Sequence, residues 1–185
     1  MNVKFTEIQN AAERKQVQEL YSKDVPAHEK AYFHFLWWKR KRPNVSFVNI
    51  YDEDKWVGFV FFSLYKDLVY VWFFATYDTI GSKDYDSAMF AEMERLYPNH
   101  RIVVSIEAEN ESADNAEQST KEKQFYEANG FRDTGYFVKR KADSFKLMLI
   151  GKSFHIEELY SVNKDVYPLI GRFIVLDLRK QIQRK

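Results

Sequence analysis

The sequence predicts an α+β fold of three layers, in which helices flank a mixed, mostly antiparallel central sheet. Short apolar segments with the character of strands occur along most of the chain, and segments with helical spacing separate them. Two short polar turns join three consecutive strands, which predicts an antiparallel meander. A chain of 185 residues is long enough to bury one substantial core.

The first part of the chain is predicted to hold one strand, two helices and the meander. Residues 3–8 alternate apolar and polar over most of their length, as half-buried strands do. Pro26 separates the two helices, and the basic run at residues 39–42 complements the dipole at the end of the second helix. The predicted elements lie at residues 3–8, 11–22, 27–41, 45–51, 56–65 and 68–74.

Helices and strands continue to alternate up to residue 150. Residues 108–120 are polar without periodicity and are predicted as a loop, while Gly130 marks the end of a helix. Further helices are predicted at residues 87–96 and 121–129, and strands at residues 101–106, 131–138 and 144–150. We expect one domain over residues 1–150. The extension over residues 151–185 is expected to pack on that domain, with a helical turn at residues 156–162 and a helix at residues 166–185.

Composition limits the partners of this chain. Lys and Arg number 28 and Asp and Glu 27, so no basic field favours nucleic acid as a partner. The chain has no cysteine, and its four histidines lack the spacing of a metal site, so we expect no metal. No signal sequence or long apolar span is visible, which favours a cytoplasmic location and no membrane partner. Strands rich in aromatic residues are compatible with a homodimer.

A strand, a loop and a helix follow one another in the middle of the chain, and this order can hold a phosphate-bearing cofactor. The loop, Gly81–Ser87, precedes a predicted helix, whose first main-chain N–H groups lack helical partners and can bind phosphate oxygens. Ser87 is a candidate N-cap of that helix. An ordinary strand-to-helix loop explains the same pattern, so both interpretations stay open.

Two side chains are candidates for acid–base chemistry. A tyrosine hydroxyl such as that of Tyr126 can protonate a departing thiolate, because tyrosine and alkyl thiols both have a pKa of about 10. Glu107, at the end of a predicted strand, can accept a proton directly or through a water molecule. Each also has a simpler interpretation, Tyr126 as a core ring and Glu107 as a surface charge.

Two segments resemble parts of the GNAT superfamily of acyl-CoA-dependent N-acetyltransferases. Tyr70–Met89 is similar to its pantetheine-binding strand, diphosphate loop and helix, and Phe125–Phe131 is similar to its late F-Y-x-x-N-G-F motif. The order of predicted elements also matches over residues 1–150. The resemblance implies transfer of an acetyl group from acetyl-CoA to a primary amine of a small-molecule or peptide acceptor.

The resemblance also implies positions for the site. The main chain of Phe74, Ala75 and Thr76 would pair with the pantetheine amides, and Tyr126 would be the general acid. Glu107, or else Glu109, would take the proton of the amine. The main-chain amides expected to line the diphosphate are those of Gly81, Ser82, Lys83, Asp84, Tyr85, Asp86 and Ser87. The side chains expected to bind the acceptor are His34, Trp37, Trp38 and Glu109.

The diphosphate loop departs from the family pattern. Gly81 stands at the usual position of an Arg or Gln, while Asp84 and Asp86 stand where small residues are common. A carboxylate about 6 Å from a phosphate charge costs about 2–3 kcal/mol at an effective dielectric constant of about 20. The sequence therefore leaves an alternative open, a catalytically inactive module of the same fold that has lost its affinity for acetyl-CoA and serves in binding or interaction.

Overall fold

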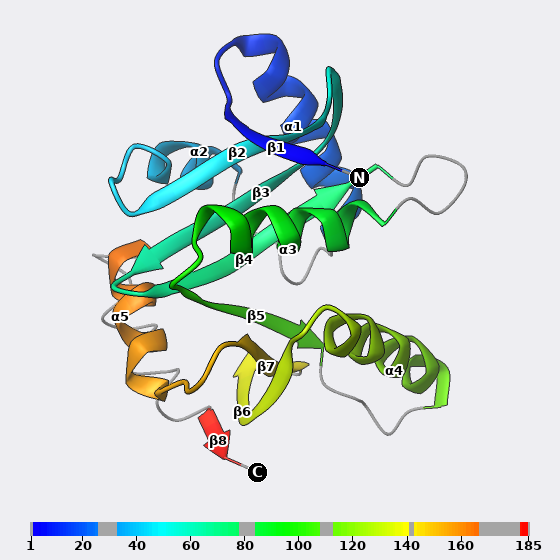
Figure 1. Ribbon diagram of the computed structural model, residues 1–185, viewed down its shortest axis with the longest axis vertical. Helices are drawn as coiled ribbons and strands as arrows, with labels where there is room; N and C mark the ends of the chain where they lie inside the picture. Colours follow the sequence, from blue (N-terminus) through cyan, green and yellow to red (C-terminus); the bar gives the residue numbers. More distant parts are fainter. Residues whose placement is uncertain are drawn as a thin grey trace. The chain divides into compact units, whose positions relative to one another are not determined.

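The structure, a computed structural model, describes residues 2–25, 33–77, 84–107, 113–140, 143–166 and 182–184. Its helices are α1 (Ala11–Asp24), α2 (Phe33–Lys39), α3 (Tyr85–Leu96), α4 (Ala113–Ala128) and α5 (Ile156–Val166) (Figure 1). Its strands are β1 (Val3–Glu7), β2 (Val45–Asp52), β3 (Lys55–Tyr65), β4 (Leu68–Thr76), β5 (Arg101–Glu107), β6 (Arg132–Arg140), β7 (Asp143–Ile150) and β8 (Ile182–Arg184). The strand order is β1-β2-β3-β4-β5-β7-β6-β8, which confirms the predicted α+β class.

The chain forms two compact units. Unit 1 comprises residues 1–63 and 71–99, and unit 2 comprises residues 64–70 and 100–185. Unit 1 therefore contains β1, β2, most of β3 and β4, and the helices α1 to α3. Unit 2 contains the strands β5 to β8, the helices α4 and α5, and the turn between β3 and β4. In the described part of the chain, no helix is long and apolar enough to cross a membrane.

The hairpin of β2 and β3 organises the sheet of unit 1. The two strands pair antiparallel, with Val45 opposite Ser63, and their register shifts between Ile50 and Tyr51. The polar turn that joins them holds Glu53 at a φ of 54°, in the left-handed region that tight hairpin turns use. The hairpin predicted from the polar turn is therefore confirmed.

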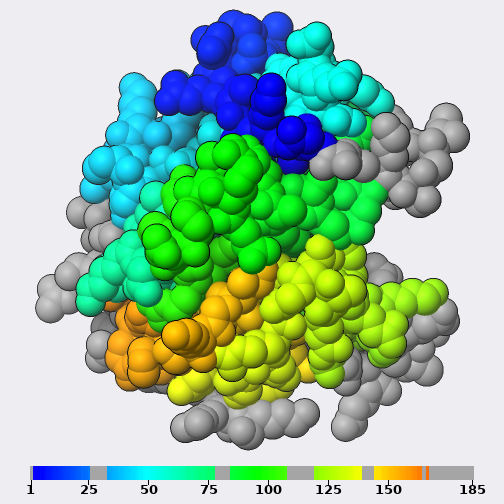
Figure 2. Space-filling model, viewed as in Figure 1, coloured from blue at the N-terminus to red at the C-terminus, as the bar shows by residue number. Residues whose placement is uncertain are grey.

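Helices cover both faces of the sheet in unit 1. Neighbouring residues on a strand point to opposite faces, so Phe73 and Phe74 of β4 face different sides. The ring of Tyr21 on α1 packs against Phe59 and Phe73, with centroid distances of 6.1 and 5.7 Å. The ring of Phe90 on α3 lies 5.4 Å from that of Phe74. Figure 2 shows α3, in green, on the near face of unit 1.

Antiparallel pairing joins the strands of unit 2. The strand β7 pairs with β5 on one side and β6 on the other, and β8 pairs with the free edge of β6. The helix α4 packs against β5. Gly130, at a φ of 82°, follows the end of α4, as the predicted C-cap requires.

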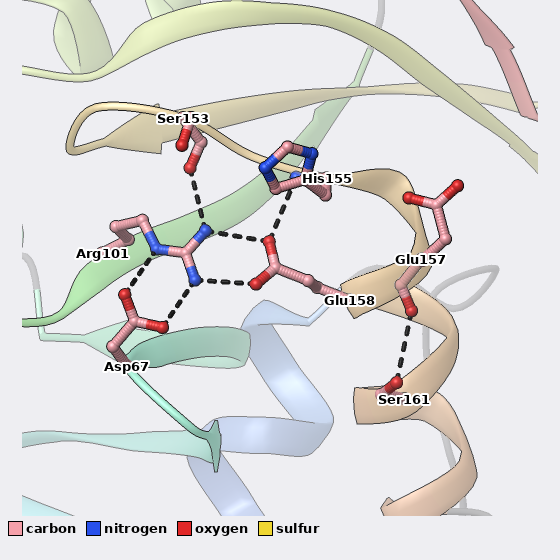
Figure 3. A network of polar contacts seen from close by, with 7 residues as sticks. All are labelled: Asp67, Arg101, Ser153, His155, Glu157, Glu158 and Ser161. Atoms are coloured by element: carbon pink, nitrogen blue, oxygen red, sulfur yellow. Dashed lines mark hydrogen bonds and ion pairs between the residues drawn. The ribbon is translucent and has the colours of Figure 1, made fainter.

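A network of charged groups centred on Arg101 attaches α5 to β5 within unit 2 (Figure 3). The Arg101 guanidinium donates two hydrogen bonds to the Glu158 carboxylate, at 2.7 and 2.8 Å, and two to Asp67, at 2.7 and 3.0 Å. It also donates to the Ser153 carbonyl at 2.9 Å. Gly151 lies against this arginine at a φ of 123°, and a Cβ there would come within 2.6 Å of the Arg101 Cγ.

Two predictions of local structure were wrong. Residues 113–120 form the first half of α4 rather than a loop. They carry no apolar periodicity, so the hydrophobic pattern does not show this helix. At the other end, the predicted helix over residues 166–185 contains the strand β8, which satisfies main-chain groups at the edge of β6. Residues 167–181, like residues 27–32 of the predicted second helix, lie outside the described residues.

Candidate functional site

The end of β4 presents main-chain groups on its edge opposite to β3. The Tyr77 N–H donates to the Val57 carbonyl of β3 at 2.7 Å. Main-chain groups alternate sides along an antiparallel strand, so those of Ala75 also face β3, whereas those of Phe74 and Thr76 face away from it. Two of the three residues predicted to pair with pantetheine thus have main-chain groups on the side of β4 that faces away from β3, where β5 is the next strand in the order.

The described acidic residues of the predicted diphosphate loop are bound within the protein. Asp84 is the N-cap of α3, where its Oδ1 accepts the Ser87 N–H at 2.9 Å and its Oδ2 accepts the Ser87 hydroxyl. The Asp86 Oδ1 accepts the Thr76 hydroxyl at 2.7 Å. The prediction that Ser87 caps this helix was wrong, because the helix begins at Tyr85 and the carboxylate of Asp84 reaches the free N–H first.

The cap changes what the start of α3 can bind. A carboxylate at a helix N-terminus compensates the positive end of the helix dipole and occupies one of its unpaired N–H groups. A phosphate oxygen would therefore compete with Asp84 for the Ser87 N–H. The N–H groups of Tyr85 and Asp86 are not subject to this particular competition, although they also lie close to the Asp84 charge in the chain.

Other predicted cofactor residues differ in their positions. The Tyr85 side chain is buried, and its hydroxyl donates to the Asp52 Oδ2 at 3.2 Å, so only its main chain is a candidate for binding a phosphate. The Phe74 ring packs on α3. The residues Gly81, Ser82 and Lys83 lie outside the described part of the chain, and so does Glu109.

The two predicted acid–base residues lie on neighbouring elements of unit 2. Tyr126, in the last turns of α4, is 5% exposed, and its ring meets Phe125 and Phe131 edge to face at 5.3 and 5.4 Å. Glu107 ends β5 opposite Phe145 of β7 and is half-buried. Among the described residues, the Glu107 carboxylate has no hydrogen-bond or ion-pair partner, so its oxygens are not committed to another side chain there.

The predicted acceptor-binding side chains on α2 point in different directions. The Trp37 ring is half-buried and stacks on Phe33, with a centroid distance of 6.3 Å and an interplanar angle of 16°. His34 is exposed. Trp38 is 56% exposed and packs loosely against Phe35 at 6.4 Å. The three residues therefore do not form one continuous aromatic wall.

The structure adds two arginines that the sequence pattern did not single out. The guanidinium carbons of Arg14 on α1 and Arg40, directly after α2, lie 4.8 and 4.0 Å from the centre of the Trp37 ring. No local signal joins Arg14 to Trp37, because the contact depends on how α1 and α2 pack. Arg40 belongs to the basic run that we interpreted as a complement to the helix dipole.

Lys39 is an unusual member of the same run. It is only 1% exposed, and its ammonium lies 5.0 Å from the centre of the Phe35 ring and 4.8 Å from that of Trp38. Burial lowers the pKa of this ammonium, and the nearby charge of Arg42 lowers it further. Among the described residues, no carboxylate pairs with it.

A hollow of about 310 Å³ lies beside the β2–β3 turn of unit 1, where four carboxylates line it: Glu7, Glu13, Glu53 and Asp54. None of the predicted site residues lines it. Of its carboxylates, that of Glu13 is engaged by the Gln9 N–H and the Asn49 amide, both at 2.9 Å. Within the described residues, no group of three His, Asp or Glu side chains converges as metal ligands do.

Comparison with known proteins identifies the fold. No family model matches the chain, and no curated protein matches it. A solved structure assigned to the GNAT family of acetyltransferases, from Bacteroides thetaiotaomicron, is similar over 92% of this chain and 98% of its own, with a TM-score of 0.71 and 18% identity.

Two further solved structures are aminoglycoside 6'-N-acetyltransferases. One, from Enterococcus faecium, has a TM-score of 0.62 and 13% identity over 84% of this chain and all of its own. The other, in complex with coenzyme A, has a TM-score of 0.61 and 14% identity over the same shares. These identities are low, so the likeness concerns the arrangement of helices and strands. The chain has the fold of the GNAT superfamily.

Proposed function

We propose that this protein transfers an acetyl group from acetyl-CoA to a primary amine of a small-molecule or peptide acceptor. The observation that carries the proposal is the likeness of nearly the whole chain to a solved structure of the GNAT family. The complex of an aminoglycoside 6'-N-acetyltransferase with coenzyme A supports the choice of acyl donor. The inactive module, the alternative drawn from the acidic loop, loses weight because both described carboxylates are engaged by groups of the protein itself.

We propose that the side of β4 that faces away from β3 receives the pantetheine part of the cofactor. An extended chain with amides can pair with the main-chain groups of a strand, and those of Phe74 and Thr76 face away from β3. For the diphosphate, we propose the main-chain donors that lead into α3, up to Asp86, since the Ser87 N–H already binds Asp84. Asp84 then weakens cofactor binding without abolishing it.

Tyr126 and Glu107 are the proposed proton donor and acceptor. The bound cofactor supplies a thioester. The neutral amine nitrogen forms a bond to the thioester carbon, Glu107 takes the proton that the nitrogen loses, and the carbon–sulfur bond breaks with its electron pair on sulfur. Tyr126 then gives its hydroxyl proton to the thiolate. The rings of Phe125 and Phe131 beside Tyr126 exclude water around its ring.

We also propose that residues 1–150 form the transferase domain and that residues 151–185 pack on it. The hydrogen bonds from Arg101 to Glu158 support the second part, because they attach α5 to β5 of the proposed domain. The pairing of β8 with β6 supports it as well.

The primary test is calorimetric titration of the protein with acetyl-CoA, followed by thiol release in the presence of a panel of primary amines. A thiol-reactive dye suits this assay, because the chain has no cysteine and gives no background. We expect saturable binding and amine-dependent release of coenzyme A. The proposal would be refuted if millimolar acetyl-CoA produced no heat of binding and no thermal stabilisation of the protein.

The Tyr126→Phe variant tests the proton donor. We expect kcat to fall by about 10²–10⁴ with acetyl-CoA affinity unchanged, because only the transferred proton is lost. Tyr65→Phe is the matched control: it also removes one hydroxyl, at a half-buried position where that group has no hydrogen-bond partner among the described residues. Equal kcat values for the two variants would exclude Tyr126 as the acid.

A further inference from the structure

Two guanidinium groups of unit 1 contact one indole ring. Arg14 comes from α1, and Arg40 follows α2, where its N–H closes the helix on the Leu36 carbonyl at 3.1 Å. Their guanidinium carbons lie 4.8 and 4.0 Å from the centre of the Trp37 ring, distances at which the cation and the ring attract each other. We refer to Arg14, Trp37 and Arg40 as the arginine–indole cluster.

Neither arginine of the cluster is paired with a carboxylate among the described residues. Arg14 donates to the His34 Nδ1 at 3.3 Å, and an imidazole carries no negative charge that could balance that of the guanidinium. The neighbouring carboxylate of Glu13 is turned to the Gln9 N–H and the Asn49 amide. The Arg40 Nε–H is buried and has no hydrogen-bond partner in the part of the chain that the structure describes. Buried or partly buried cations in proteins usually have such partners.

Contact with a ring uses the face of a guanidinium and leaves its N–H donors, which lie in the guanidinium plane, available. Two such groups beside one ring also repel each other, and an anion that binds both relieves this repulsion. Planar forks of this kind match the two oxygens of a carboxylate or a phosphate. Arg14 and Arg40 are both half-buried, so the cluster suits a compact anion rather than an extended polymer.

We propose that the arginine–indole cluster is a binding site for a compact oxyanion, a carboxylate or a phosphate monoester. The Nη groups of Arg14 and Arg40 supply the hydrogen bonds, and Trp37 holds the two guanidinium groups in place. The identity of the anion rests on the proposed acetyltransferase activity. With that activity, the anion is part of the acceptor, which then carries both a primary amine and an acidic group. The binding site itself does not depend on that activity.

The test follows the indole N–H signals of the four tryptophans by ¹⁵N NMR while inorganic phosphate, and separately succinate, is added at constant ionic strength. Trp37→Phe assigns the signal of the cluster, and the exposed Trp38 serves as an internal reference. We expect a saturable shift of the Trp37 signal with a Kd on the order of millimolar, as a small anion bound by two forks gives. The probe that binds with the lower Kd, phosphate or succinate, shows whether the site prefers a phosphate or a carboxylate.

Variants distinguish a specific binding site from a general attraction of anions to positive charge. Arg40→Gln is expected to weaken binding at least tenfold, and Arg40→Lys, which keeps the charge but loses the planar fork, to weaken it by a smaller factor. Arg42→Gln is the matched control, because it removes the same charge from an exposed position two residues away and should change the Kd less than twofold. The backbone ¹⁵N spectrum confirms that each variant is folded.

Two results would overturn the proposal: no saturable shift of the Trp37 signal with either probe, or equal weakening by Arg40→Gln and Arg42→Gln. Both are independent of acetyl-CoA, so they do not bear on the acetyltransferase activity. Conversely, a protein that binds phosphate at Trp37 but releases no coenzyme A would refute the activity and keep the anion site.

Discussion

The ion pair between Arg101 and Glu158 should hold α5 far more strongly than the one between Arg101 and Asp67. The side chains of Arg101 and Glu158 are 13% and 15% exposed, whereas that of Asp67 is 56% exposed. A charged hydrogen bond sheltered from water contributes about 1.5–3 kcal/mol, and an exposed ion pair contributes about 0.2–1 kcal/mol. We therefore expect Glu158→Gln to lower the free energy of unfolding by about 2 kcal/mol and Asp67→Asn by less than about 1 kcal/mol.

Urea unfolding of these variants, alone and combined with Arg101→Met, gives two double-mutant cycles that measure each pair directly. For a chain of this length, a loss of about 2 kcal/mol corresponds to a fall in Tm of about 4–8 °C. The coupling energy of Arg101 with Glu158 should exceed that with Asp67 at least twofold. Equal coupling energies would refute the argument that shelter from solvent decides the strength of these pairs.

The pH dependence of stability provides a second check on the same network. Hydrogen bonding by Arg101 holds the pKa of Glu158 below its ordinary 4.5 and that of Asp67 below its ordinary 3.8. The unfolded chain thus binds more protons than the folded one in this acidic range. The stabilisation is complete above pH 4.5 and is lost as the pH falls through the folded pKa values. Arg101→Met should make the free energy of unfolding depend less on pH in this acidic range.

Three further changes test other parts of the structure. Asp84→Asn keeps an acceptor for the Ser87 N–H but removes the charge, so calorimetry should show an affinity for acetyl-CoA that is about tenfold higher. Urea unfolding should show a stability within about 0.5 kcal/mol of wild type. An unchanged affinity would mean that the charge of Asp84 does not affect cofactor binding. Gly58→Ala places a Cβ 2.2 Å from the Ala75 carbonyl oxygen, and should destabilise the protein by at least about 2 kcal/mol; a wild-type Tm would contradict this. Lys39→Met should raise the Tm, because it removes a buried ammonium that pairs with no carboxylate among the described residues. The pKa of Lys39 is lowered below 10.5 by burial, so wild-type stability should rise with pH up to that value and the variant should lack this rise.

Much of the fold follows from hydrophobic pattern. The strands β1 to β7 lie within two residues of the predicted segments, because alternation and short apolar runs between polar turns report directly on which residues face the core. The hydrophobic pattern did not predict elements whose residues have no regular apolar spacing. Residues 113–120 form helix without an apolar stripe, and β8 is decided by an open edge of β6 rather than by its own three residues.

For the candidate site, too, the sequence shows some features and the structure alone shows others. The sequence shows that Asp84 and Asp86 precede or begin a helix, but not which groups their carboxylates meet. The structure adds that Asp84 binds Ser87 and that Asp86 binds Thr76, ten residues earlier on another element. Their partners change the expected electrostatics of the loop, and they turn a prediction of simple repulsion into one of competition for a single N–H.

The sequence by itself determined the class of fold and the order of its elements, because the side-chain periods of strands and helices are local properties of the chain. Only the tertiary structure decided which charges meet. The contact of Arg14 with Trp37 and the bonds from Arg101 to Glu158 join residues far apart in the chain, and such contacts depend on how whole helices and strands pack.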